Sequence, residues 1–133
     1  MKVAHGRAGS PAEQRTATFT GTVYMDPVLA ADGVSVNTVT FIHSARTYWH
    51  SHPGGQLLVV TAGMGIVATR SGDVQVLAAG DFVWAEPDEE HWHGAAPDSL
   101  LTHVAVSHGE TLWLDEVDRP DYAVLGGDPR SRP

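Results

Sequence analysis

The chain has 133 residues, no cysteine and a formal net charge of −8. Its length predicts one domain with a single hydrophobic core, and the lack of cysteine excludes disulfides and thiolate metal ligands. The single lysine and the acidic balance argue against binding nucleic acid, which needs a basic surface. No apolar run approaches the length of a membrane span, and the start lacks a signal-peptide core, so no membrane association and a cytoplasmic location are expected.

In chain order, residues 1–16 are predicted to form a mobile arm, residues 17–122 the folded domain and residues 123–133 a flexible tail. Short segments rich in valine, threonine and aromatic residues alternate like strands. These segments are 18–24, 34–42, 56–62, 66–70, 74–77, 81–84, 91–95, 100–107 and 111–114. Many short strands with turns between them predict an all-β sandwich or barrel.

Turns between these strands and one short helix after them are also predicted. Turns are predicted at residues 31–33 and 71–73, and Gly63 is predicted to interrupt the strand that begins at Gln56. Residues 118–123 are predicted to form one short C-terminal helix. The sequence contains no internal repeat and no linker, so a second domain is not expected.

Two histidines and a glutamine form the most informative pattern of the chain. His50, His52 and Gln56 have the same parity across a Pro-Gly-Gly turn, and side chains of a strand alternate between its faces. His91 follows a second glycine-led strand. Three neutral imidazoles and one amide oxygen suit a divalent first-row transition metal. A pair of histidines in a strand is weak support by itself, because histidines also occur as hydrogen-bonded core residues.

The same residues resemble the two motifs of the cupin family. The first, Gly-x5-His-x-His-x3,4-Glu-x6-Gly, is similar to His50-x-His52-x3-Gln56-x6-Gly63, with glutamine in place of glutamate. The second, Gly-x5-Pro-x-Gly-x2-His, is similar to Gly80-x5-Glu86-x-Asp88-x2-His91. Asp88 replaces a glycine there, and aspartate tolerates a left-handed backbone better than most residues. The turn is therefore expected to survive the replacement.

Further segments between residues 17 and 122 resemble a group of bacterial single-domain cupins. That group includes manganese-dependent hydroxynitrile lyases and proteins found near carboxymuconolactone decarboxylases. The resemblance implies a jelly-roll β-barrel and assigns four metal ligands, His50, His52, Gln56 and His91. It implies Mn²⁺ first and Fe²⁺ second, with Ni²⁺ or Zn²⁺ as alternatives. Because all four ligands are neutral, the ion keeps its full charge, which favours Lewis-acid chemistry on an anionic group.

Two further histidines are candidates for proton transfer. His93 shares the strand face of His91, and His103 lies in the strand of residues 100–107. Histidine titrates near neutral pH and can move a proton beside a metal. Either residue can instead be a hydrogen-bonded part of the barrel wall or a support for a ligand.

Several functions remain compatible with this pattern. A lyase that cleaves or forms a carbon–carbon bond of a small molecule is the first hypothesis. The alternatives are an iron- or nickel-dependent dioxygenase of a phenol or diketone, a sugar-acid or polyketide isomerase or cyclase, and a non-catalytic ligand-binding protein. Apolar barrel faces and the N-terminal arm also predict a homodimer or homotetramer.

Overall fold

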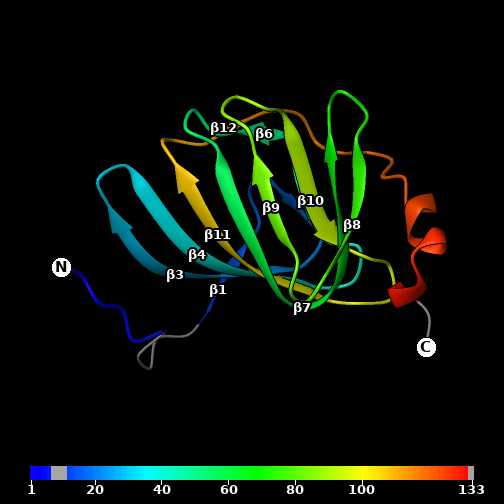
Figure 1. Ribbon diagram of the computed structural model, residues 1–133, viewed down its shortest axis with the longest axis horizontal. Coiled ribbons are helices and arrows are strands. Elements are labelled where there is room, and N and C mark those ends of the chain that lie inside the picture. Colours follow the sequence, from blue (N-terminus) through cyan, green and yellow to red (C-terminus); the bar gives the residue numbers. More distant parts are fainter. Residues whose placement is uncertain (7–11, 132–133) are drawn as a thin grey trace.

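The computed structural model describes residues 1–6 and 12–131 and has an all-β architecture (Figure 1). The described residues form short and long strands that pair antiparallel. The strands are β1 (Glu13–Arg15), β2 (Phe19–Thr20), β3 (Val23–Ala31), β4 (Val34–Phe41), β5 (Arg46–Thr47), β6 (His50–Ser51), β7 (Gln56–Thr69), β8 (Val74–Ala78), β9 (Phe82–Ala85), β10 (His91–Ala95), β11 (Leu101–His108) and β12 (Leu112–Trp113). The predicted all-β barrel is therefore confirmed.

The strands form two sheets that share β7 and face one another across the barrel interior. The long sheet runs in the order β1, β3, β4, β11, β7, β9. The short sheet pairs the second half of β7 with β8 on one side and β10 on the other, and continues through β5 to β2 and through β6 to β12. Because β8 and β9 pair only with β7, the barrel is nearly closed rather than continuous around its circumference.

Strand β7 passes from one sheet to the other at Gly63, where the sequence predicted that the strand would end. Gly63 has a φ of 80°, and the pairing with β11 shifts register between Thr102 and His103. A β-carbon on Gly63 would lie 1.8 Å from the carbonyl oxygen of Leu100. Glycine therefore permits both the left-handed backbone and the close approach of β11, so the strand bends and continues.

Apolar side chains between the sheets form the core, and the C-terminal segment covers the outside of the short sheet. The inner cluster includes Val23, Phe41, Val60 and Leu101. On the outer face of the short sheet, a second group packs against Val117 and the residues that follow it. This group comprises Trp49, Ile66, Ala68, Val74, Trp92, Tyr122, Val124 and Leu125. The tail thus protects one apolar sheet face from water.

The two ends of the chain differ in detail from the sequence prediction. Residues 13–15, placed within the arm, form β1 and pair with β3. The short helix expected at residues 118–123 lies farther along the chain, as a 3₁₀ helix that begins at Ala123. Pro120 lacks an amide hydrogen and disfavours helical backbone in the residue before it. The structure has 3₁₀ helices at Ala123–Gly127 and Pro129–Ser131. Within the described residues, no helix is long and apolar enough to span a membrane.

Candidate metal centre

The polar residues of the two sequence motifs meet at a small cavity inside the barrel. Its volume is about 70 Å³. Strands β6 and β10 bring His50 and His91 directly opposite one another in the antiparallel pairing, and their rings lie 4.3 Å apart between centroids. The cavity is lined by His50, His52, Gln56, His93 and His103, and His91 contacts His50 and Gln56 without itself lining the cavity. All six predicted site residues are buried, so the barrel gathers them in one place.

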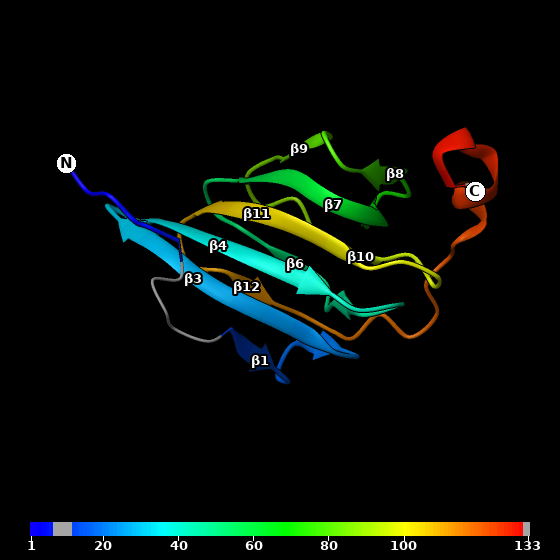
Figure 2. The ribbon, with the colours of Figure 1, turned by 90° about the horizontal axis from the view of Figure 1, so that it is seen from below.

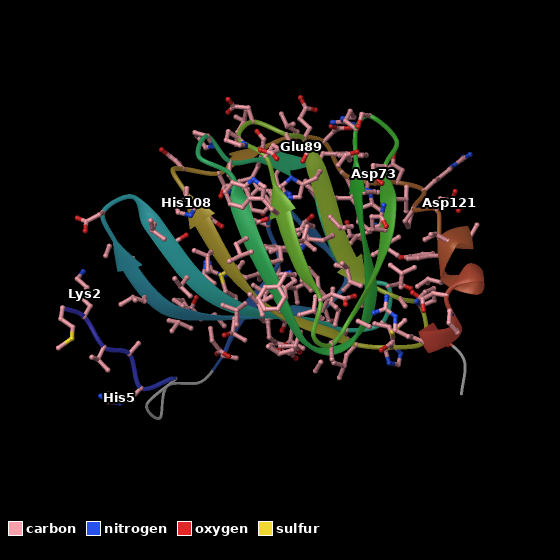
Figure 3. The ribbon with its side chains drawn as sticks, in the orientation of Figure 1. Lys2, His5, Asp73, Glu89, His108 and Asp121 are labelled. Carbon is pink, nitrogen blue, oxygen red and sulfur yellow. The ribbon has the colours of Figure 1, made fainter. Side chains whose placement is uncertain are left out.

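Hydrogen bonds to the backbone orient the rings of His50 and His91. Nδ1 of His50 lies 2.9 Å from the carbonyl oxygen of Tyr48, and Nδ1 of His91 lies 2.9 Å from that of Glu89. A carbonyl only accepts, so Nδ1 carries the proton in each neutral ring and Nε2 is left as an electron-pair donor. Glu89 belongs to the loop before β10, at the barrel end where β11 reaches His108 (Figure 3).

Gln56 is held with its amide oxygen toward His91. Its Nε2 donates to the Ser107 hydroxyl at 3.0 Å, and its Oε1 lies 3.1 Å from Nε2 of His91. The serine contact fixes which end of the amide faces the histidines. The oxygen is therefore positioned as a fourth neutral donor beside the imidazoles.

The most compact histidine group differs by one member from the ligand set expected from the sequence. Candidate ligand atoms of His50, His91 and His93 all lie within 4.8 Å of one another. His52 is close by, with its ring 5.0 Å from that of His50. The Nε2 atoms of His52 and His93 are buried and lack a well-aligned hydrogen-bond partner in the described residues. Buried nitrogen donors without partners fit a bound cation.

Burial keeps these imidazoles uncharged. Burial lowers the pKa of His50 and of His93 well below the ordinary value, and neighbouring histidines lower both further. The pKa of His52 is lowered to about 4, first by burial and then by the charge of His91, although an interaction with Gln56 opposes this. Burial also lowers the pKa of His91. Neutral rings are the form that binds a metal ion.

His93 and His103 form a hydrogen-bonded pair behind the other histidines. Nε2 of His103 lies 3.0 Å from Nδ1 of His93, and burial lowers the pKa of His103 to about 4. His93 also lies between the other rings, with its centroid 5.2 Å from that of His50. The structure therefore places His103 beside His93, where it contacts His93 Nδ1.

The cavity mouth contains aromatic residues that the sequence analysis did not single out. Trp113 packs on His50 at 4.8 Å between ring centroids and on Phe19 at 5.5 Å. It is 37% exposed, so the cavity opens to solvent beside it. Asn37 lines the opposite wall from β4. The alternation of residues 34–42 could have predicted that Asn37 faces the barrel interior. No sequence motif pointed to Trp113.

Lowering the pH should destabilise the metal-free protein. The unfolded chain takes up protons near the ordinary histidine pKa of 6.5, whereas folded His52 and His103 stay neutral down to about pH 4. The unfolded state then binds more protons, so stability falls as the pH drops through this window. Each histidine should cost about 1.3 kcal/mol between pH 7.5 and 5.5. Urea unfolding with chelator at both pH values measures the difference, and equal free energies of unfolding would contradict it.

Replacing Ser107 with alanine should weaken metal binding through Gln56. The substitution removes the hydroxyl that accepts from Gln56 Nε2, so the amide oxygen is no longer held toward His91. Loss of such an orienting contact typically costs roughly tenfold to hundredfold in metal affinity. Competition with a metal indicator dye measures the change. Ser35→Ala, on the cavity wall in β4, is the matched control, and equal affinities for the two variants would contradict the orienting role.

Comparisons with known proteins agree with this barrel and its histidine centre. Residues 37–107 match the family model described as the cupin domain, which is more than half of the chain. The chain belongs to the cupin family. It is similar to (R)-mandelonitrile lyase of Granulicella tundricola, with 44% identity over 111 residues that cover 78% of this chain and 85% of the relative.

Two solved structures are similar to this chain in fold. A cupin-like protein from Thermotoga maritima has a TM-score of 0.78 and 36% identity, and covers 84% of this chain and 91% of its own. A polyketide cyclase from Streptomyces resistomycificus has a TM-score of 0.71 over 98% of this chain and 96% of its own. At 17% identity, the cyclase shares the fold alone.

Proposed function

We propose that this protein is a metal-dependent hydroxynitrile lyase, an enzyme that cleaves a cyanohydrin to a carbonyl compound and hydrogen cyanide. The observation that carries the proposal is the neutral donor set joined to the His93–His103 pair in one buried cavity. The similarity to (R)-mandelonitrile lyase supports the same reaction class. A fold alone would not, because cupins of similar shape host different reactions.

His50, His52, Gln56 and His91 would hold the metal, and we propose Mn²⁺ first and Fe²⁺ second. A bound divalent ion would supply positive charge that lowers the pKa of a nearby hydroxyl and favours an anion. The residues of the chain add no negative charge to that set. Their neutrality therefore suits a reaction that passes through an alkoxide and releases cyanide.

His93 would take and return the proton of the reaction. Its Nε2 faces the other histidines and has no well-aligned partner, while its Nδ1 contacts His103. When Nδ1 donates to His103, Nε2 is a free acceptor for the substrate hydroxyl proton. The electron pair of the O–H bond then forms the carbonyl, and the electron pair of the carbon–carbon bond leaves with cyanide. The proton held by His93 is transferred to cyanide and completes hydrogen cyanide. By accepting from Nδ1, His103 would hold His93 in the tautomer that starts this sequence.

The cavity suits the reacting end of such a substrate. A volume of about 70 Å³ admits the hydroxyl, the nitrile and the carbon that bears them, but not a large organic group. The remainder of the molecule would lie at the mouth against Phe19, Met25 and Trp113. Aromatic and apolar side chains at that position favour an aromatic or bulky apolar substituent.

Cleavage of racemic mandelonitrile tests the proposal. We expect protein loaded with Mn²⁺ to release benzaldehyde well above the rate in buffer, and to consume one enantiomer first on a chiral column. Protein treated with chelator is the control for the metal. The proposal fails if fully loaded protein leaves mandelonitrile and aliphatic cyanohydrins untouched. Oxygen uptake with phenols or diketones by the iron-loaded protein would then favour the dioxygenase alternative.

A further inference from the structure

One hydroxyl group at the histidine cavity has no part in the reaction proposed above. Thr111 lines the cavity, and its Oγ1 lies 3.2 Å from Nδ1 of His52. Strand β12 pairs antiparallel with β6, with Leu112 opposite Ser51, and the two strands lie side by side (Figure 2). The same register carried one residue farther sets Thr111 opposite His52. The contact between the two side chains therefore follows from the backbone pairing.

This hydroxyl is a different kind of partner from those of the neighbouring histidines. Nδ1 of His50 and Nδ1 of His91 face backbone carbonyls, which only accept a hydrogen bond. A hydroxyl can donate or accept. If Thr111 donated to Nδ1 of His52, the ring proton would be on Nε2. If Nδ1 donates to Thr111 instead, Nε2 carries an electron pair.

The surroundings of His52 favour the second arrangement. Its Nε2 is buried and has no well-aligned hydrogen-bond partner in the described residues. A proton on that atom would be a buried donor without an acceptor, which is costly. A metal ligand, the role proposed above for His52, likewise needs an electron pair on Nε2. Nδ1 therefore carries the ring proton and donates it to Oγ1 of Thr111.

The hydrogen of the Thr111 hydroxyl is then available to another molecule. Because Oγ1 accepts from His52, its own hydrogen points away from that ring. His52 is the one hydrogen-bond partner of this hydroxyl within the described part of the chain. Thr111 also lines the cavity and is only half-buried. The hydroxyl can thus donate to a small molecule that occupies the cavity.

The place of Thr111 along the row of histidines decides which end of the substrate it meets. Ring centroids lie 5.0 Å apart from His52 to His50 and 5.2 Å apart from His50 to His93. His103 follows, in contact with Nδ1 of His93. Thr111 contacts the His52 end of this row. A cyanohydrin hydroxyl that gives its proton to His93 leaves the nitrile as the polar group for the other end.

We propose that the Thr111 hydroxyl donates a hydrogen bond to the nitrile nitrogen of the substrate and holds cyanide as it leaves. The inference rests on the lyase function proposed above. Negative charge develops on cyanide as the carbon–carbon bond breaks, and hydrogen bonds to charged acceptors are the stronger ones. Thr111 therefore stabilises the transition state more than the bound substrate. Other small linear anions should receive the same hydrogen bond.

Azide binding tests the hydrogen bond without any catalysis. Azide is a linear anion with a nitrogen acceptor at each end, and the visible absorption of the protein loaded with Co²⁺ reports its binding. Thr111→Val keeps the shape of the side chain and removes the hydroxyl. We expect its azide dissociation constant to rise roughly tenfold to hundredfold, as for a hydrogen bond to a charged group. Thr111→Ser should bind azide nearly as well as the unaltered protein.

Thr38→Val is the matched control for this comparison. Thr38 is also half-buried, but it lies on β4 outside the cavity lining. The same substitution there should leave azide binding unchanged. Metal content is measured in every sample, and saturating metal is used, because loss of the acceptor for His52 Nδ1 also weakens metal binding.

Mandelonitrile kinetics test the role of Thr111 in the reaction. For Thr111→Val we expect kcat to fall roughly tenfold to hundredfold with KM nearly unchanged, because the hydrogen bond strengthens as charge develops. Thr111→Ser should restore kcat. A residue that only supported His52 would instead lower the metal content, and saturating metal would then restore the full rate.

Three results would overturn the proposal. They are equal azide affinities of Thr111→Val and Thr38→Val, no azide binding to the loaded unaltered protein, and a weaker azide complex with unchanged kcat. Failure of the lyase function gives a different result, because the unaltered protein would then cleave no cyanohydrin. In that case the azide contrast alone decides whether Thr111 donates to an anion in the cavity.

Discussion

Gln56→Glu should lower kcat/KM for cyanohydrin cleavage by roughly two to three orders of magnitude while the metal stays bound. The substitution keeps the shape of the side chain and places a carboxylate where the amide oxygen now lies 3.1 Å from His91 Nε2. Two unit charges 4 Å apart interact by about 4 kcal/mol at an effective dielectric of 20. The carboxylate thus cancels much of the positive charge that would stabilise an alkoxide and cyanide.

Metal content separates this effect from simple loss of the ion. We expect Gln56→Glu to hold metal at least as tightly as the unaltered protein, because an anionic donor strengthens binding. Gln56→Ala is the companion variant, and it should lose affinity without adding charge. If Gln56→Glu kept full activity with full metal content, the neutrality of the donor set would have no part in catalysis.

His103→Gln should lower kcat by roughly two to four orders of magnitude, the usual contribution of a general acid–base group. His103 lies 3.0 Å from His93 Nδ1 and acts through that residue, so it is a positioning residue for the proton acceptor. His93→Gln should have an effect at least as large. Because the two act as a unit, the double variant should be no slower than the slower single variant.

A structural role for His103 predicts different data. His43→Gln is the matched control, since His43 is exposed and lies outside the cavity lining. For His103→Gln we expect unchanged metal content, a nearly unchanged KM and an altered pH profile of kcat. A variant that is merely less stable would keep the pH profile and regain activity on cooling, and that result would reject the role in proton transfer.

The sequence was sufficient for the barrel and for the six buried polar residues of the candidate site. Alternation with period two predicted that the side chains of His50, His52 and Gln56 point to the same side. Asp88 adopts the left-handed backbone expected of it, with a φ of 63°. The hairpin turn at residues 71–73 is confirmed. These features are local, so the side-chain pattern of a few residues contains the information that determines them.

Features that depend on distant contacts were less predictable. The continuation of β7 past Gly63 depends on the approach of Leu100, which lies 37 residues farther along the chain. The position of Trp113 on His50 arises because β12 pairs with β6. The closeness of His93 to His50 and His91 likewise results from the pairing of β10 with β6 and β7. The metal-ligand roles of His50, His52, Gln56 and His91 stay predictions.

Elemental analysis of protein purified without chelator tests the central claim most directly. We expect about one manganese or iron ion per chain in the unaltered protein. In His91→Ala we expect almost none, because that substitution removes a nitrogen shared by the compact histidine group and the ligand set expected from the sequence. His43→Gln, outside the cavity, should retain the full content. Absence of metal from the unaltered protein, even after reconstitution with Mn²⁺ and Fe²⁺, would contradict the metal centre and the reaction built on it.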